Sequence, residues 1–343
     1  MSVRIICADV MDGLAHLADE SVNCCVTSPP YWGLRDYGVD GQIGLEPTPE
    51  AFLVKMIEAF REVRRVLRSD GTLWLNIGDG YASAGGAGWQ GKNGQRASRA
   101  FTAPNYKGNS AAAAAVKPKD LIGMPWMVAF ALRADGWWLR QEIIWSKPNP
   151  MPESVQDRCT KSHEHLFLLS KSDRYWWNAE AIQEPVSGGA HARRSMKKPD
   201  GWNTASGAHG NFHPAGREKG KAAGVTPKSA KPRSGIKANE SFHAAVCDLV
   251  ETRNKRSVWT IATQPYSDAH FATFPEELPE TCIKAGCPVG GTVLDPFGGA
   301  GTTGLVADKL GRHAILIELN PEYAAMAERR IRGDCPMFTE VRP

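Results

Sequence analysis

Two short runs of this 343-residue sequence contain residue types that could do chemistry. The first is Ser28-Pro29-Pro30-Tyr31, which directly follows the apolar run 22–27. Two consecutive prolines fix φ and remove two backbone N–H groups, so the carbonyl oxygens and the Ser28 hydroxyl form a rigid set of hydrogen-bond acceptors. Rigid acceptors of this kind predict that the bound group is an amine.

The second run is a glycine-rich turn that follows the apolar residues Val293 and Leu294. Its segment 299–304 fits the pattern G-x-G-x-x-G, in which glycines permit a sharp turn and let a ligand approach the backbone. The next apolar run ends in Glu318, whose carboxylate could accept both hydroxyl groups of a ribose. The run predicts a dinucleotide or an S-adenosylmethionine site. A nucleoside triphosphate is disfavoured, because Lys and Ser/Thr do not follow the glycines as in a P-loop.

Alternating strands and amphipathic helices are expected to bring the two runs together. The pattern predicts an α/β fold with a doubly wound, mostly parallel sheet that helices cover on both faces. Ligands of such sheets gather at the carboxyl ends of the strands, so both runs should share one rim. Strands are expected at 3–8, 22–27, 72–77, 138–145, 165–170, 292–294 and 313–317, and helices near 10–17, from Thr48 to a turn at 69–71, and at 121–132, 275–284, after 301 and 321–331.

The positive charge of the chain is concentrated in one segment. Residues 186–256 contain 14 Lys and Arg against 5 Asp and Glu, a net charge of +9 in a chain whose total is +4. A concentration of this kind favours a polyanion partner, although a solvated, disordered insertion would have the same composition.

Several classes of protein are excluded by composition. No apolar run approaches the roughly 18 residues that cross a bilayer, and the N-terminus lacks the features of a signal peptide, so we expect a cytoplasmic protein with no membrane partner. Eight cysteines without a Cys-x-x-Cys pair predict reduced, mostly buried thiols and no metal site.

Both runs resemble motifs of one enzyme family. Ser28–Tyr31 is similar to the catalytic tetrapeptide of the DNA amino-methyltransferases, which methylate the N4 amine of cytosine or the N6 amine of adenine, and Asp295–Thr302 resembles their S-adenosylmethionine loop. The tetrapeptide precedes the loop and the basic segment lies between them, which is the order of the β group. The resemblance spans 5–81, 143–177 and 253–331 and implies a seven-stranded sheet of the S-adenosylmethionine-dependent methyltransferase type with an inserted target recognition region.

The resemblance also assigns residues to roles. In the family, the target amine is held by the Ser28 side chain and the Pro29 carbonyl, Pro30 completes the motif, and Tyr31 stacks on a base extruded from the duplex. Ser28 in place of Asp favours cytosine N4, with adenine N6 as the alternative. The cofactor residues that the resemblance implies are Asp9, Phe274, Asp295, Phe297, Gly298, Gly299, Gly301, Thr302 and Glu318.

The same resemblance implies a domain organisation. Residues 1–184 are expected to form the catalytic part, with a mobile loop at 82–120, and 257–343 the cofactor-binding part of the same domain. Residues 185–256 are expected to be a partly disordered target recognition region that binds double-stranded DNA. A companion restriction endonuclease is a further expected partner, and a nicotinamide-dependent oxidoreductase is a more distant alternative. The predicted DNA-binding residues are Arg193, Arg194, Lys197, Lys198, Arg217 and Arg233, and the loop could add Lys92, Arg96, Arg99 and Lys107.

Overall fold

A computed structural model of the chain describes residues 1–33, 37–82, 116–117, 119–185, 252–264, 273–334 and 340–342. The chain divides into two units, one of Met1–Ile182 with Lys255–Pro343 and the other of Gln183–Asn254. The first unit contains the sheet and both motifs. Most of the predicted loop at 82–120 and of the basic segment at 185–256, including every predicted DNA-binding residue, lies outside the described residues.

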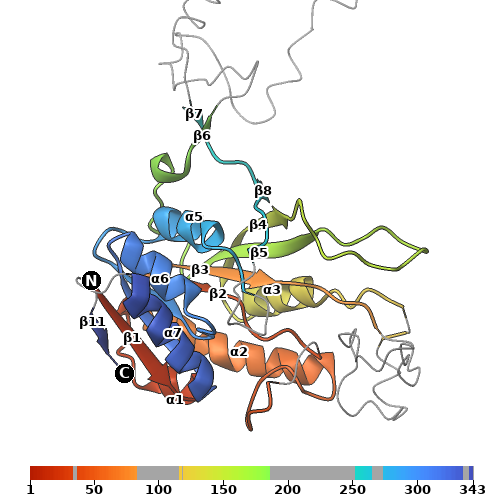
Figure 1. Cartoon of the computed structure of the whole chain (residues 1–343), viewed down its shortest axis with the longest axis horizontal. Coiled ribbons are helices and arrows are strands. Elements are labelled where there is room, and N and C mark those ends of the chain that lie inside the picture. The colour runs from red at the N-terminus through yellow and green to blue at the C-terminus, as the bar shows by residue number, and fades with distance from the viewer. Residues whose placement is uncertain are drawn as a thin grey trace, which may run out of the picture. The chain divides into compact units, whose positions relative to one another are not determined.

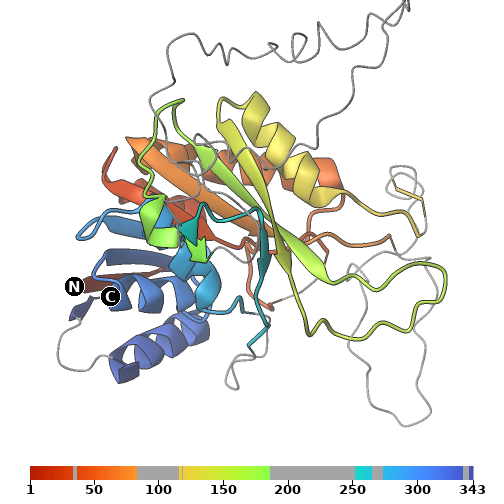
Figure 2. The ribbon, with the colours of Figure 1, turned by 90° about the horizontal axis from the view of Figure 1, so that it is seen from above.

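The first unit is built on a sheet whose strand order is β11-β1-β10-β9-β2-β3-β5-β4-β8 (Figures 1 and 2). Seven of these strands form its centre: β1 (Ser2–Cys7), β10 (His313–Glu318), β9 (Thr292–Asp295), β2 (Val22–Thr27), β3 (Leu67–Ile77), β5 (His163–Ser170) and β4 (Trp138–Ser146). Short strands β11 (Glu340–Arg342) and β8 (Val258–Thr260) extend the seven at either edge. Within this described sheet β5 runs against both of its neighbours, and every other pair is parallel, so the predicted mostly parallel α/β fold is confirmed.

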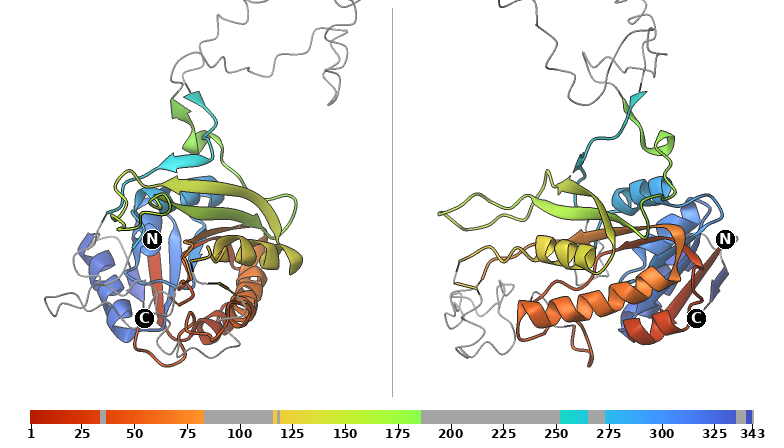
Figure 3. Two further views of the ribbon diagram at one scale, coloured as in Figure 1. Left: turned by 90° about the vertical axis from the view of Figure 1, so that its right-hand side faces the viewer. Right: turned by 180° about the vertical axis from the view of Figure 1, so that it is seen from behind.

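Helices cover both faces of the sheet (Figure 3). On one face, α1 (Val10–Ala15), α2 (Pro49–Val66) and α3 (Met124–Ala134) contribute to one apolar cluster; on the other, α5 (Glu277–Gly286), α6 (Thr302–Lys309) and α7 (Pro321–Asp334) contribute to a second. Burial on both faces explains why the central strands are apolar along their length instead of alternating with polar residues. The described cysteines form no disulfide, and Cys24, Cys25, Cys282 and Cys287 are buried thiols, as expected.

Helix α2 begins as its sequence predicts and ends earlier. Thr48 caps it, because its hydroxyl accepts a hydrogen bond from the Ala51 N–H at 3.2 Å, and Pro49 occupies the first turn. The helix ends at Val66 and β3 begins at once, pairing Leu67 with Val22. The predicted terminating turn at 69–71 is therefore wrong, since these residues belong to the first part of the strand.

In the second unit, the described residues include a short antiparallel pair, β6 (Glu184–Pro185) and β7 (Thr252–Arg253). The Arg253 guanidinium binds the Glu184 carboxylate at 2.8 Å. This pair holds together the two ends of the segment 186–251.

Candidate active site

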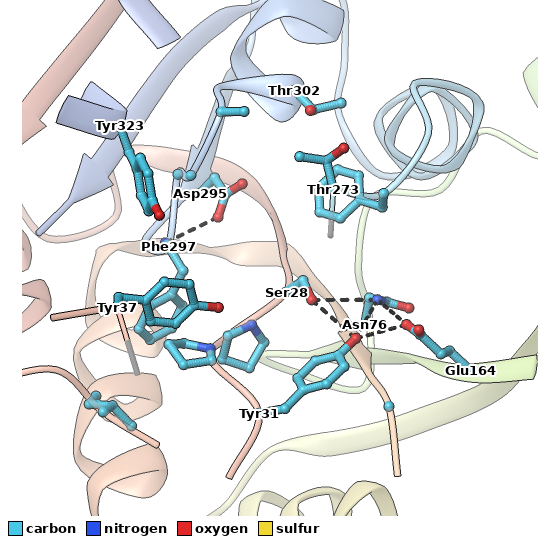
Figure 4. A pocket seen from close by; sticks show the side chains of 18 of the residues that line it. Ser28, Tyr31, Tyr37, Asn76, Glu164, Thr273, Asp295, Phe297, Thr302 and Tyr323 are labelled. Atoms are coloured by element: carbon cyan, nitrogen blue, oxygen red, sulfur yellow. Dashed lines mark hydrogen bonds between the residues drawn. The ribbon is translucent and has the colours of Figure 1, made fainter. Parts of the chain in front are cut away.

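The carboxyl ends of the central parallel strands border a pocket of about 980 Å³ (Figure 4). Its wall includes Ser28 just after β2, Asp295 at the end of β9 and Glu318 at the end of β10. Because β2 and β9 pair directly, with Cys25 opposite Leu294, the two sequence motifs face each other although about 270 residues separate them. The two motifs therefore lie on one rim of the sheet, as predicted.

The Ser28–Tyr31 corner continues β2 without a break. Ser28, Pro29, Pro30 and Tyr31 all line the pocket. The Tyr31 ring lies against Gly78, which follows β3, and a Cβ built on Gly78 would come within 2.7 Å of the ring atom Cε2. Glycine at position 78 therefore makes room for the aromatic ring.

A network of polar side chains lies behind Tyr31 (Figure 4). The Tyr31 hydroxyl donates to the Glu164 carboxylate at 2.8 Å, and the Asn76 amide donates to the same oxygen at 2.9 Å. The Lys147 ammonium forms an ion pair with the other oxygen of Glu164. Ser28 has only long contacts with this network, at 3.4 Å to the Tyr31 hydroxyl and 3.5 Å to the Asn76 amide.

The network sets the charges at this end of the pocket. Burial alone would raise the pKa of Glu164, but the Lys147 ammonium and the hydrogen bonds from Asn76 and Tyr31 outweigh it and lower the pKa. The pKa of Tyr31 is raised, chiefly by burial and then by the Glu164 charge, so its hydroxyl remains a donor at neutral pH. The Oδ1 atom of Asn76 is buried without a hydrogen-bond partner among the described residues.

Asn76, Lys147 and Glu164 were not predicted from the sequence. Asn76 and Glu164 sit on neighbouring strands β3 and β5, and Lys147 immediately follows β4. The available signal was a polar residue within a run that is otherwise apolar, as in Leu73–Ile77. The neighbouring histidines have separate contacts: His165 bonds Glu142 at 2.7 Å, and His163 lines the pocket with a pKa lowered by burial.

At the opposite end of the pocket, Asp295 joins the two motifs through short hydrogen bonds. Its carboxylate accepts from the Thr27 hydroxyl at 2.6 Å and from the Thr303 hydroxyl at 2.7 Å. Thr27 is the last residue of β2, directly before Ser28, and Thr303 belongs to α6. Burial raises the pKa of Asp295 to about 6, although both hydroxyl donors and the Phe297 N–H oppose the shift.

Glu318 has the same kind of environment. Its two carboxylate oxygens accept backbone N–H groups from Gly299 and Asn320, each at 2.8 Å. Burial raises its pKa as well, although these hydrogen bonds oppose the shift. Each oxygen retains a lone pair for a further donor, so the carboxylate can still accept hydroxyl groups.

The remaining predicted cofactor residues are on the pocket wall, with one exception. Asp9, Phe274, Phe297, Gly298, Gly299 and Thr302 line the pocket. Gly301 does not: it caps α6 with φ of +76°, and a Cβ there would lie 2.8 Å from the Cβ of Ala327. Its glycine is required by the left-handed backbone and by the close approach of α7. Tyr37 and Tyr323, which the sequence analysis did not single out, also line this end.

Comparison with known proteins shows which family has this fold and site. Residues 22–329 match the family described as DNA methylase, which covers N6 and N4 methyltransferases. The chain is 42% identical over 332 residues to the type II methyltransferase M.SmaI of Serratia marcescens, covering 96% of this chain and 91% of that protein. It is 41% identical to M.Cfr9I of Citrobacter freundii, with coverages of 95% and 86%.

Solved structures agree in fold. The PvuII DNA methyltransferase, described as cytosine-N4-specific, superposes with a TM-score of 0.59 at 16% identity, over 96% of this chain and 86% of that one. The Thermus thermophilus protein TTHA0409, a putative DNA modification methylase solved in complex with S-adenosyl-L-methionine, gives a TM-score of 0.55 at 22% identity, over 100% and 98%.

The chain belongs to the DNA methylase family and is an S-adenosylmethionine-dependent DNA methyltransferase that acts on an amino group. The family assignment, resting on most of the chain, sets aside the nicotinamide-dependent oxidoreductase. None of the helices in the described ranges is long and apolar enough to cross a membrane. The described residues also contain no cluster of three or more His, Cys, Asp or Glu side chains that could hold a metal ion.

Proposed function

We propose that the chain methylates the N4 amine of cytosine in a specific DNA sequence, with the base flipped into the pocket beside Tyr31. The observation that carries the proposal is that the Ser28–Tyr31 corner and the Asp295–Thr302 loop line one pocket. Ser28 in place of Asp favours cytosine over the alternative, adenine N6. The PvuII enzyme, which shares the fold, is described as cytosine-N4-specific, in agreement with this choice.

The cofactor would occupy the end of the pocket between Glu318 and Asp295. The donor set fits a nucleoside, because Glu318 keeps acceptor lone pairs for ribose hydroxyls. Asp9 would approach the adenine, and Phe274 would lie at the methionine end. When bound, S-adenosylmethionine supplies the electrophilic methyl group.

The catalytic corner would activate the target amine. The lone pair of an exocyclic amine is delocalised into the ring, so the nitrogen is a poor nucleophile until acceptors on its N–H groups make it pyramidal. Ser28 Oγ and the Pro29 carbonyl would be these acceptors. The long contacts of Ser28 with Tyr31 and Asn76 support this role, since an incoming amine would displace only weak interactions.

Tyr31 would stack on the flipped base. Its ring is held by Gly78 on one side and its hydroxyl by Glu164, so the aromatic face is oriented before the base arrives. Flipping costs a few kcal/mol, which stacking and phosphate contacts would offset. The segment 185–256 would be the target recognition region and supply those phosphate contacts, through residues such as Arg193 and Lys197.

The proposal extends to the cellular setting. The similar proteins M.SmaI and M.Cfr9I are type II methyltransferases, so we expect the chain in the cytoplasm of a bacterial or phage-infected cell, with a companion restriction endonuclease that cleaves the same unmethylated sequence.

Product analysis tests the base and the site together. Long-read sequencing of DNA from cells that express the chain would locate the methylated sequence, and mass spectrometry of the nucleosides should find N4-methylcytosine. Exclusive N6-methyladenine would establish the alternative.

Ser28→Ala should lower methyl transfer by about a hundredfold, because one of the two acceptors is lost, with cofactor affinity unchanged. Undiminished transfer in this variant would show that the catalytic assignment is wrong.

A further inference from the structure

The loop between β4 and β5 extends beyond the ends of both strands on the pocket side of the sheet (Figures 1 and 2). Residues 147–162 form this loop, and its first half carries the sequence Asn149-Pro150-Met151-Pro152. Asn149, Pro150, Met151 and Glu153 all belong to the pocket wall. The loop therefore forms part of the entrance through which a base would enter.

The loop is fixed to the rest of the unit on both sides. The Asn149 side chain exchanges two hydrogen bonds with the Thr263 backbone, at 3.0 and 3.3 Å. The Arg158 guanidinium binds Glu153 at 2.6 Å and lies 3.8 Å from the centre of the Tyr81 ring. These contacts tie the loop to the segments that follow β8 and β3.

Met151 is the more exposed of two large apolar residues that this loop presents to solvent, the other being Val155. Its side chain is 83% exposed, the largest fraction among the exposed large apolar residues of the described chain. Proline on each side restricts the backbone there to extended conformations, so the side chain is presented at a constant position. Isolated exposed apolar residues are common, but Met151 lies between the contacts that fix the loop and also lines the pocket.

We propose that Met151 is a wedge that enters the DNA duplex at the target pair and fills the space left by the flipped base. Proteins that unstack DNA insert apolar side chains, methionine among them, between base steps. The unbranched, polarisable thioether of methionine adapts to the faces of neighbouring bases. This inference rests on the proposed DNA methylation with base flipping and names the residue that compensates for it.

The experiment compares two duplexes that differ only opposite the target. Both contain the target sequence that the mapping in cells identifies. One duplex is fully paired, and the other has an abasic site opposite the target base, where flipping costs less. Single-turnover methylation would be measured for the wild type, Met151→Ala and Met151→Leu. Val289→Ala is the matched control, since Val289 is 75% exposed and lies before the amino end of β9, away from the pocket.

Met151→Ala should be about tenfold slower than the wild type on the paired duplex and within about twofold of it on the abasic duplex. Met151→Leu and Val289→Ala should match the wild type on both. An equal loss on the two duplexes, or no loss on either, would overturn the wedge. A wild type that methylates neither duplex would instead contradict the proposed function, so the two failures are distinguishable.

Discussion

The two ends of the pocket hold their carboxylates in opposite ways. At the end that we propose for the cofactor (the cofactor end), burial raises the pKa values of Asp295 and Glu318, and neutral hydroxyl and backbone donors satisfy both groups at 2.6–3.1 Å. At the end that we propose for the target base (the target end), the Lys147 ammonium helps to lower the pKa of Glu164.

The hydrogen bonds at the two ends differ as well. Ser28 has contacts of 3.4 and 3.5 Å, and the Oδ1 atom of Asn76 has no partner among the residues that the structure describes. The cofactor end is thus a satisfied framework, whereas the target end keeps weak or unmade hydrogen bonds. Unsatisfied buried groups are uncommon in proteins and call for a functional explanation. We therefore expect a bound ligand to change the hydrogen bonds at the target end more than those at the cofactor end.

The largest effect is expected when the Glu164 carboxylate at the target end is removed. Glu164→Ala leaves the Lys147 ammonium without its counter-ion and the Tyr31 hydroxyl without its acceptor. We expect the free energy of unfolding to fall by about 3 kcal/mol, because one member of a largely buried ion pair is lost. Methyl transfer should fall about a hundredfold, because Tyr31 is no longer oriented. Chemical unfolding and single-turnover kinetics would measure these effects.

A double variant separates stability from activity. Glu164→Leu with Lys147→Met replaces both charges by apolar groups and should recover most of the stability but not the activity. Calorimetry should find S-adenosylmethionine affinity within about twofold of the wild type in either variant. A large loss of cofactor affinity would mean that the two ends are energetically coupled, contrary to the comparison.

The second test uses pH to examine the cofactor end. Asp295 has a pKa of about 6 in the folded protein against 3.8 for an ordinary aspartate, so between these values the folded state binds more protons than the unfolded state. The Asp295 contribution to the free energy of unfolding should therefore decrease by about 3 kcal/mol as pH rises from about 4 to about 6, and then level off.

Asp295→Asn is the reference for this measurement, since its side chain does not titrate. Urea unfolding of both proteins from pH 4 to 8 should give a stability difference that changes in this window, to the disadvantage of the wild type as pH rises. A difference that is constant with pH would show that Asp295 keeps an ordinary pKa and that the cofactor end is more solvated than its geometry indicates.

The smallest expected effect concerns the packing behind the glycine loop. Gly301 and Gly290 have nearly the same positive φ, +76° and +77°, but only at Gly301 would a Cβ meet a neighbour, Ala327 at 2.8 Å. Alanine should cost about 1 kcal/mol at either position through backbone strain. At Gly301 it should cost about 1 kcal/mol more, and lower cofactor affinity about fivefold, because the loop must shift.

Calorimetric titration of Gly301→Ala and Gly290→Ala would compare these affinities directly. Equal affinities for S-adenosylmethionine would show that α7 does not hold the loop in its binding conformation, and the description of the cofactor end as a fixed framework would fail.

The sequence predicted the cofactor end of the pocket better than the polar network of Asn76, Lys147 and Glu164 behind Tyr31. Glycine turns, proline corners and apolar strand runs are local patterns, so they located Ser28–Tyr31, the loop after β9 and Glu318. The network depends instead on register between strands. Asn76 pairs with Leu166 across β3 and β5, two residues from Glu164, and nothing in the sequence determines that pairing.

Two glycine and turn assignments illustrate the same limit. Gly301 fits the cofactor pattern, yet its contact is with α7, which is specified some 25 residues later in the chain. The turn residues 69–71 lie in β3 between two points of pairing with β2, Leu67 opposite Val22 and Thr72 opposite Cys24, where the register shifts. In both cases the conformation of the residue depends on a neighbour that is distant in the sequence and that a local sequence pattern does not reveal.

The short β6–β7 pair has a consequence for how specificity can change. Because Pro185 and Thr252 are paired across it, the chain leaves and re-enters at nearly one point, whatever is inserted between them. The entropy of closing such an excursion grows only with the logarithm of its length. The whole intervening stretch could therefore be exchanged for a longer or shorter one at little entropic cost, and if it is the target recognition region that we propose, such an exchange would change the DNA sequence preference without altering the Ser28–Tyr31 corner.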